Sequence, residues 1–527
     1  MSTLDMLTYN GIDSAVTFEC AEAFFSEINK SPEHKETYDM TIALLQPLMY
    51  FMSRGLRVDE KNLEIEQIRV AKEIVEKQAE LDALCGEPLN PNSPKQCQQY
   101  FYGKLGITPY TTIKKDAYGN KKRGITTDDK AMQRMAKGTT NRKPIKEASL
   151  VQHIRKLIKL KGTYLDITLD RDKRLRCSFN PRGTRFGRLS SSKTVFDTGM
   201  NLQNLPETFK RFIIADEGKI LWEMDKAQAE WVATAFISRD ANMIKVCEEG
   251  SDPHAYTASQ MYNVTEDLVK KESKLLGHIG DIDEIAEVRG SMTEGGLMVD
   301  VEGKPLDLTT LPRTMSMRQA GKKSNHGLNY KETYKGFALH NEIMEKDAKV
   351  IVNKYHSIYP GLKQFYSWVE TKLAEDRTLV NCFNRSYKFL NQWNEDLFKA
   401  AVSYLPQSTI SDLVNRAIIK IYNDNDFCMK NIEMLTQVHD SILGQFDTPE
   451  DYINFFIIAR AMLKCRDHLN PTMEYHGKEF TIGTDLKIGT CWGHMVEVEL
   501  PEGSKTEDAH KLAKRIQEAL ETLQKEL

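Results

Sequence analysis

Two apolar runs on either side of a polar pair form the clearest pattern along this chain. Residues 435–446, LTQVHDSILGQF, place β-prone residues on both sides of His439 and Asp440. This pattern predicts a strand, a tight turn and a returning strand. We therefore expect the Asp440 carboxylate to lie at the tip of a hairpin.

A second apolar run, residues 219–224, predicts a strand that ends at Asp225, before a helix over residues 228–237. One carboxylate rarely holds Mg²⁺ alone, so we expect the fold to bring Asp225 and Asp440 together. Two aspartates that share two Mg²⁺ ions are typical of phosphoryl or nucleotidyl transfer. The alternative role for Asp225 is an N-cap of the helix that follows.

Helical spacing dominates the rest of the chain. A period near 3.6 residues predicts helices in the N-terminal segment to Phe25 and over residues 37–52, 59–84, 316–329, 397–422 and 507–527. Residues 108–129 contain Gly119-Asn120 and predict an exposed loop or hairpin. Residues 270–311 carry several glycines and little pattern, and we interpret them as an insertion.

Composition describes a protein of ordinary polarity with one basic region. The chain has 527 residues, of which 40 % are hydrophobic and 28 % charged, and its net charge is −3. These values are typical of a soluble globular protein with several subdomains. Residues 114–188 nevertheless hold 22 Lys and Arg against 7 Asp and Glu. Such a run is either a solvated face or a surface that follows nucleic-acid phosphates.

The nine cysteines are scattered singly, without the spacing of a zinc site. Reduced thiols and the lack of a signal pattern or a membrane-spanning apolar run predict a cytoplasmic protein that does not contact a membrane. If the chain is encoded by a phage, the compartment would be the host cytoplasm.

The predicted helix at residues 316–329 carries cationic groups on one face. Arg318, Lys322 and His326 follow one another at four-residue steps, and Tyr330 stands at the next step. Two cations and an aromatic ring on one stripe could bind a triphosphate and stack on a base. The alternative is a solvated basic helix.

Taken in order, these motifs resemble the polymerase portion of family A (polymerase I–like) DNA polymerases of the phage type, over about residues 31–495. The motif at Asp225 to Glu230 resembles the first catalytic motif, Arg318 to Tyr330 the fingers helix, and Gln437 to Asp440 the third motif. Supporting matches stand at residues 92–96, 161–164, 187–192, 201–204 and 252–254, and at Gln407.

The resemblance implies an α+β fold shaped like a right hand, with an antiparallel-sheet palm, helical fingers and a helical thumb. Its implied divisions are a remnant of an exonuclease-domain helix (1–30), the thumb (31–165), the palm (166–240 and 401–498), the fingers (241–400, with an insertion near 270–311) and a C-terminal helical extension (499–527). We expect that extension to pack on the body of the protein.

The resemblance also implies an activity and its residues. The expected reaction is template-directed addition of deoxynucleotides to a primer 3′ end, with two Mg²⁺ ions on Asp225, Asp440 and the Lys226 carbonyl. Nucleotide-binding residues would be Arg318, Lys322, His326, Tyr330, Gln228, Glu230 and His254, with Glu230 excluding a ribose 2′-hydroxyl. DNA-binding residues would be Arg188, Gln203, Asn204, Gln407, His439, Lys161, Ser93 and Lys95.

The chain departs from the family pattern at a few positions. Lys226 and Ala227 replace the usual Tyr-Ser, Ser441 replaces the usual Glu, and His326 stands where Phe or Tyr is usual. Only a remnant of an exonuclease domain is expected, with Asp13 as a weak candidate carboxylate. We therefore predict no proofreading from this chain.

Its expected partners are primer-template DNA and dNTPs. A separate exonuclease or processivity factor could also bind it. Two other functions stay open: a single-subunit RNA polymerase and a non-catalytic protein that binds primer-template.

Overall fold

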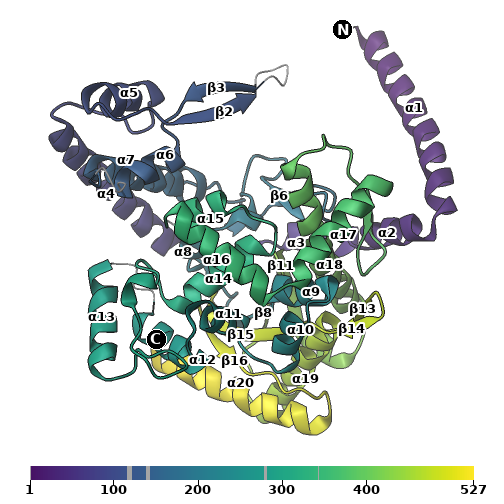
Figure 1. The fold of residues 1–527 in the computed structure, drawn as a ribbon. Helices are drawn as coiled ribbons and strands as arrows, with labels where there is room; N and C mark the ends of the chain where they lie inside the picture. Colours follow the sequence, from purple (N-terminus) through teal and green to yellow (C-terminus); the bar gives the residue numbers. More distant parts are fainter. Residues whose placement is uncertain (1, 116–120, 138–142, 278–281, 342, 527) are drawn as a thin grey trace.

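The computed structural model describes residues 2–115, 121–137, 143–277, 282–341 and 343–526. Figure 1 shows many helices arranged around one central sheet, with strands and helices mixed along the chain. This arrangement confirms the predicted α+β class.

The main sheet has eight antiparallel strands in the order β11-β12-β8-β15-β7-β1-β4, and β16 pairs with β15. The predicted strand before Asp225 and the predicted hairpin at Asp440 are both present in it. The strands are β1 (Leu56–Val58), β4 (Arg174–Leu175), β7 (Ile213–Ile214), β8 (Lys219–Lys226), β11 (Ile432–Val438), β12 (Ser441–Asp447), β15 (Thr484–Cys491) and β16 (His494–Val498).

The largest hydrophobic core lies on this sheet. Trp222 of β8 and Phe446 of β12 are fully buried in it, where apolar burial supplies the main driving force for folding. Helices α3 (Leu45–Arg54), α19 (Tyr452–Leu469) and α20 (Thr506–Glu526) pack on the same core. The predicted C-terminal helix is thus α20, and contacts with α19 and β16 support its predicted role as a packing helix.

The predicted thumb, residues 31–165, is divided between two cores. Helix α2 (Pro32–Ala43) leads into α3 and β1, which join the main sheet. Helices α4 (Glu60–Cys85), α6 (Asp129–Lys137) and α7 (Lys146–Lys159) instead enclose a separate core. Strands β2 (Thr111–Lys115) and β3 (Lys121–Ile125) form the predicted hairpin, whose Gly119-Asn120 tip lies outside the described residues.

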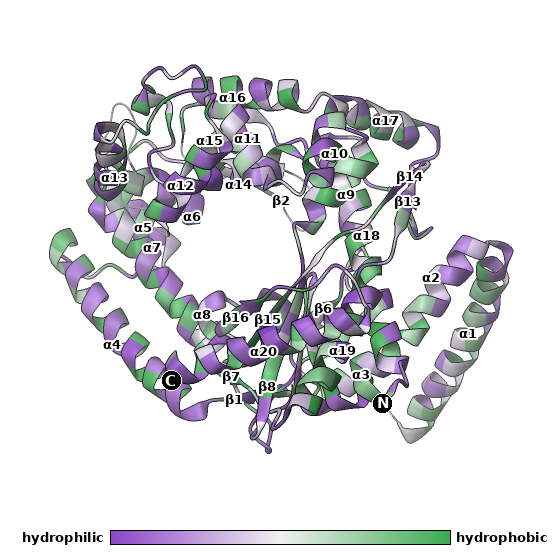
Figure 2. Ribbon diagram, turned by 90° about the horizontal axis from the view of Figure 1, so that it is seen from below, coloured by the Kyte–Doolittle hydropathy of each residue, from purple (hydrophilic) through white to green (hydrophobic). Residues whose placement is uncertain are grey.

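A second large core holds the helices between β8 and β11. Trp231, Tyr355, Tyr359 and Tyr404 are buried there. The helices are α9 (Ala229–Ser238), α10 (Ala241–Glu248), α11 (Pro253–Tyr262), α14 (Met317–Leu328), α15 (Tyr334–Asn341), α16 (Glu345–Ile358), α17 (Gly361–Glu375) and α18 (Glu395–Asn423). Figure 2 shows α4 and α7, α14 and α16, and the main sheet on different sides of a ring-shaped ribbon.

The segment that we interpret as an insertion, residues 270–311, contains helical structure. It contains the end of α12 (Glu266–Leu276) and all of α13 (Ile282–Glu294). Apolar residues at Ile285, Val288 and Met292 do follow helical spacing, but Gly290 interrupts the pattern.

Helix α1 (Thr3–Lys30) confirms the predicted N-terminal helix and extends away from the rest of the protein in Figure 1. None of its residues is buried. Among the described residues, no helix is both long and apolar enough to cross a membrane.

Short elements complete the described chain. They are α5 (Pro94–Gln98), η1 (Gln99–Lys104), η2 (Leu160–Leu165), β5 (Ser178–Asn180), β6 (Ser190–Ser192), η3 (Leu202–Asn204), α8 (Glu207–Lys210), η4 (Leu308–Thr310), β9 (Thr378–Val380), β10 (Ser386–Lys388), η5 (Phe427–Asn431), β13 (Met473–Tyr475) and β14 (Lys478–Phe480).

Candidate active site

The register of the main sheet brings the two predicted carboxylates together. Strands β11 and β12 are joined by a two-residue turn, in which His439 has a left-handed φ of 56°. Ser441, the first residue after the turn, pairs directly with Asp225 of the neighbouring strand. Asp440 therefore lies one residue along the chain from the cross-strand partner of Asp225.

Both carboxylates resist ionisation. Burial raises the pKa of Asp225 to about 7, and repulsion from Asp440 and Glu223 adds to the shift. Burial likewise raises the pKa of Asp440. Two half-buried, mutually repelling carboxylates fit a divalent cation, which would neutralise them.

The set of protein ligands around such a cation is small. Within the described part of the chain, no three or more His, Cys, Asp and Glu side chains are grouped to hold a metal ion. The predicted ligands of a cation at this site are the two carboxylates and the Lys226 carbonyl.

The Lys226 side chain has a role that the sequence did not reveal. It is buried, and its ammonium donates to the Leu469 carbonyl at 2.9 Å, to Asn470 at 2.7 Å and to Thr484 at 3.0 Å. It also donates to the Ile482 carbonyl. These bonds tie the end of β8 to the end of α19 and to the start of β15.

Glu223 is a further carboxylate near Asp225, which the sequence pattern did not indicate. It is buried two residues before Asp225, and it accepts hydrogen bonds from Trp492 at 2.9 Å and from Ser441 at 3.3 Å. The available signal was its position, because residues two apart on a strand lie on the same face.

Gln203, which is predicted to bind DNA, has a side chain that is held inside the protein. Its side chain is buried, donates to the Gln437 carbonyl at 2.8 Å and accepts from the His439 amide at 3.2 Å. Both ends of the amide are used to hold the hairpin turn, so this side chain faces the protein. Asn204 and His439 are exposed, as a DNA contact would require.

A three-residue network stands beside Asp440. Arg188 donates to one oxygen of Glu230 at 2.6 Å, and the Tyr330 hydroxyl donates to the other at 2.6 Å. Burial raises the pKa of Tyr330 well above its usual value, so the phenol keeps its proton. The charge of Glu230 raises the pKa of Asp440 and the charge of Arg188 lowers it, so the network lies close to the hairpin tip.

Two details of this network differ from expectation. Helix α14 ends at Leu328, so Tyr330 lies just beyond the helix and does not continue its cationic stripe. Gln407, expected to be exposed, is half-buried and hydrogen-bonds to Tyr330.

Helix α14 presents the predicted cations. Lys322 and His326 are exposed, and the Arg318 side chain, 35 % exposed, donates its Nε to Asp252 at 2.6 Å. Residues four apart share one helix face, so the three predicted groups form a single stripe. Gln228, at the start of α9, is also exposed and free to face a ligand.

His254 lies behind this stripe. It is buried, its Nδ1 is 3.0 Å from the Asn325 amide nitrogen, and its ring centroid is 6.1 Å from that of His326. Burial lowers the pKa of His254 to about 4, so it is neutral at pH 7. It would therefore contact a phosphate as a neutral group.

Of the remaining predicted DNA-binding residues, Ser93 and Lys95 lie in the segment with its own core, whereas Lys161 lies in η2, whose Leu165 is buried in the core of the main sheet. Lys161 pairs with Asp166 at 2.7 Å, Ser93 accepts a hydrogen bond from the Gln96 amide at 3.3 Å, and Lys95 is exposed. Ser93 thus caps α5, a role that leaves its predicted DNA contact untested.

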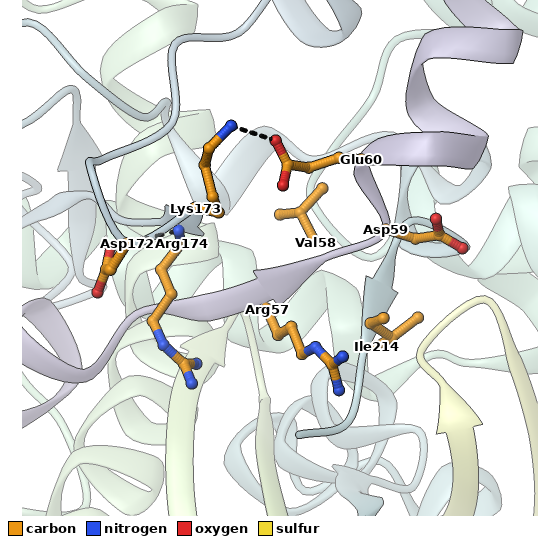
Figure 3. A pocket seen from close by; sticks show the side chains of 8 residues that line it. All are labelled: Arg57, Val58, Asp59, Glu60, Asp172, Lys173, Arg174 and Ile214. Carbon is orange, nitrogen blue, oxygen red and sulfur yellow. Dashed lines mark hydrogen bonds and ion pairs between the residues drawn. The ribbon is translucent and has the colours of Figure 1, made fainter. Parts of the chain in front are cut away.

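A pocket of about 350 Å³ lies away from these residues, at the edge of the main sheet (Figure 3). Its charged side chains include both signs, and Lys173 pairs with Glu60 at 2.6 Å. None of its eight lining residues was predicted to bind a ligand. They are Arg57, Val58, Asp59, Glu60, Asp172, Lys173, Arg174 and Ile214.

The chain is similar to known polymerases over most of its length. It is 28 % identical over 415 residues to the thermostable DNA polymerase I of Thermus aquaticus, and 22 % identical over 514 residues to DNA polymerase I of Borreliella burgdorferi. These alignments cover 75 % and 94 % of this chain, but only 42 % and 48 % of the relatives. The chain thus spans less than half the length of either relative.

A solved structure shares the fold. The polymerase domain of Pol1 from M. smegmatis, in complex with DNA primer-template and dNTP, superposes with a TM-score of 0.65 at 22 % identity, covering 86 % of this chain and 70 % of that one. The sequence pattern of DNA polymerase family A matches residues 60–275 and 307–494. This match extends over more than half of the sequence, and the chain therefore belongs to DNA polymerase family A.

Proposed function

We propose that this chain is a template-directed DNA polymerase that adds deoxynucleotides to a primer 3′ end. The observation that carries the proposal is the pairing of Ser441 with Asp225, which brings Asp225 and Asp440 to one edge of the sheet. The raised pKa of both aspartates is the expected signature of carboxylates arranged to share cations.

The proposed cofactor is a pair of Mg²⁺ ions held by Asp225, Asp440 and the Lys226 carbonyl. Bound ions would activate the primer hydroxyl and neutralise the departing pyrophosphate. The chain itself supplies a rigid platform, because the Lys226 ammonium and the Gln203 amide fix the two strand ends that carry the ligands.

Helix α14 would bind the incoming nucleotide. Arg318 and Lys322 are suited to phosphate oxygens, and Asp252 orients the Arg318 guanidinium by accepting from its Nε. The exposed ring of His326 is available to stack on the sugar or base. Glu230, held by Arg188 and Tyr330, is suited to exclude a 2′-hydroxyl.

The proposed division of the chain follows from these roles. The main sheet, with residues 166–240 and 401–498, would be the palm, residues 241–400 the fingers, and the segment around α4 and α7 the thumb. The basic residues 114–188 would follow the phosphates of the primer-template duplex, giving an affinity that falls with salt. The phage origin, and the interpretation of residues 1–30 as an exonuclease remnant, stay predictions from resemblance.

Primer extension with Mg²⁺ and four dNTPs tests the proposal. We expect Asp225→Asn and Asp440→Asn each to lower the rate by about 10³-fold or more, because each removes a cation ligand. Asp447→Asn is the matched control: Asp447 ends the same hairpin, its side chain is 76 % exposed, and it pairs with Lys219. Extension by both active-site variants at nearly the wild-type rate would contradict the two-metal proposal.

Two further assays separate the alternatives. Extension with ribonucleotides in place of deoxynucleotides distinguishes a single-subunit RNA polymerase, which the fixed Glu230 carboxylate disfavours. Binding of primer-template without any extension would instead identify a non-catalytic protein.

Proofreading is tested on a mismatched primer. We expect no degradation by the purified chain. Degradation that Asp13→Ala abolishes would show an exonuclease at α1.

A further inference from the structure

The family pattern skips residues 276–306, yet the described residues 282–306 of this segment include side chains that share a core with the helix that carries the proposed triphosphate contacts. Met292 of α13 and Met298 share a hydrophobic core with Val269 of α12 and with Met317, the first residue of α14. The segment is thus in contact with the start of α14.

A buried ionic network links the same elements. Arg289 of α13 pairs with Glu272 of α12 at 2.6 Å, and their side chains are 5 % and 0 % exposed. Arg289 also donates to the Pro312 carbonyl at 2.6 Å and to the Met315 carbonyl at 3.1 Å. These carbonyls belong to the stretch that leads into α14.

Glu272 bonds directly to the first residue of α14. One of its oxygens accepts from the Met317 amide at 2.7 Å, while the other faces Arg289. A carboxylate at a helix N-terminus satisfies a free amide and complements the helix dipole. Met317 directly precedes Arg318, so the network fixes the turn of α14 that presents Arg318.

We propose that residues 282–306 act as a brace for α14, in which Arg289 sets the position of the helix and thereby the affinity for the incoming nucleotide. Arg289 is a positioning residue, because it acts through Glu272 and the backbone of residues 312–317. The inference rests on the proposed function, since α14 must bind the triphosphate for the brace to matter.

The network is suited to positioning because all of its polar groups are buried and paired. Such a network permits few alternative arrangements, and loss of one partner leaves the others unsatisfied. Removal of Arg289 alone would leave the Glu272 charge buried without its partner, which destabilises a protein strongly. Replacement of both members by apolar residues avoids that cost.

The test therefore uses the double variant Arg289→Met with Glu272→Leu. Apolar replacement of both members leaves no unpaired buried charge, so this variant should melt at a higher temperature than Arg289→Met alone, although below wild type because three backbone groups lose a partner. It lacks the bonds to Pro312, Met315 and Met317. In single-nucleotide incorporation we expect its KM for dNTP to rise by about three- to tenfold, the size of a typical coupling within one network.

Two controls sharpen the measurement. Lys304→Ala removes an exposed charge from the same segment, where Lys304 pairs only with its neighbour Glu302 at 2.5 Å, and should leave the KM for dNTP unchanged. The affinity for primer-template should also be unchanged in the double variant, because the segment with α4 and α7 is not altered.

If the double variant does not fold, the single variant Arg289→Lys tests the brace instead. A lysine keeps the charge but lacks the planar fork that reaches three acceptors, so its KM should also rise. The brace is overturned if the variant that folds has a KM for dNTP within about twofold of the wild-type value. This conclusion does not depend on any change in kcat. Failure of the wild-type chain to extend any primer would instead overturn the proposed function.

Discussion

The hydroxyl of Tyr330 donates a hydrogen bond to Glu230 across 2.6 Å, from a position just beyond the end of α14. Arg188 holds the other carboxylate oxygen at 2.6 Å. Glu230 is the second residue of α9, which follows β8, so this contact joins the end of the proposed nucleotide-binding helix to the proposed palm. The carboxylate is thereby fixed in one orientation.

Tyr330→Phe should weaken discrimination against ribonucleotides. Loss of a hydrogen bond to a charged group costs about 1.5–3 kcal/mol, so we expect the ratio of kcat/KM for deoxy- over ribonucleotides to fall by about tenfold. Glu230→Ala should lower the ratio further. Tyr334→Phe, in the neighbouring helix, is the control. A ratio unchanged by Glu230→Ala would contradict a role for Glu230 in sugar selection.

Asp225→Asn should stabilise the protein at neutral pH when cations are chelated. The folded pKa of Asp225 is about 7 against an ordinary 3.8. Between these values the folded protein binds a proton that the unfolded chain has lost, so the free energy of unfolding falls as pH rises from about 4 to about 7. Melting in EDTA should therefore show a gain for the variant at pH 8 that shrinks toward pH 4. An equal gain at both pH values would contradict the assigned pKa.

Lys226→Met should destabilise the protein through the acceptors it leaves behind. The buried carbonyls of Leu469 and Ile482 lose the donor that Lys226 provides, whereas Asn470 still accepts from Thr484, and we expect a loss of at least about 2 kcal/mol in the free energy of unfolding. Lys219→Met, at the other end of β8, removes only partly exposed ion pairs and should cost less than about 1 kcal/mol. Urea midpoints of the two variants provide the comparison, and equal midpoints would contradict the anchoring role.

His326→Phe should alter the use of chain terminators. His326 is exposed on the cationic face of α14, where its ring nitrogens can contact the sugar of an incoming nucleotide. Phenylalanine keeps the flat ring but removes the nitrogens, so we expect incorporation of dideoxynucleotides to fall relative to deoxynucleotides. Competition between the two in primer extension measures the ratio, and equal ratios in wild type and variant would remove the hypothesis.

Local patterns were enough to predict the centre of the site. The hairpin at Asp440 and the strand that ends at Asp225 each follow from a short apolar run beside a polar residue, because strand periodicity is encoded in neighbouring residues. The cationic face of α14 follows in the same way from four-residue spacing. The resemblance to family A polymerases then indicated that these motifs belong to one site.

Contacts between distant segments could not be predicted in this way. The bonds of Lys226 to the end of α19, and of Gln203 to the hairpin, join residues that are far apart in the chain. Lys and Gln side chains are polar and are mostly exposed in proteins, so neither residue was expected to bond to a buried backbone carbonyl. The pairing of Arg289 with Glu272 was hidden for a further reason, because Gly290 obscured the helical pattern of α13.

The order of strands in the main sheet also constrains when the sheet can fold during synthesis of the chain. Strand β8 lies between β12 and β15, which a ribosome produces long after it. Until they emerge, the apolar strand that ends at Asp225 has no neighbours on either side, and unpaired strands of this kind are prone to associate with other chains. Interrupted translation before β12 and β15 would therefore leave a fragment that is prone to aggregate, and the paired arrangement of Asp225 and Asp440 can form only after these strands have been synthesised.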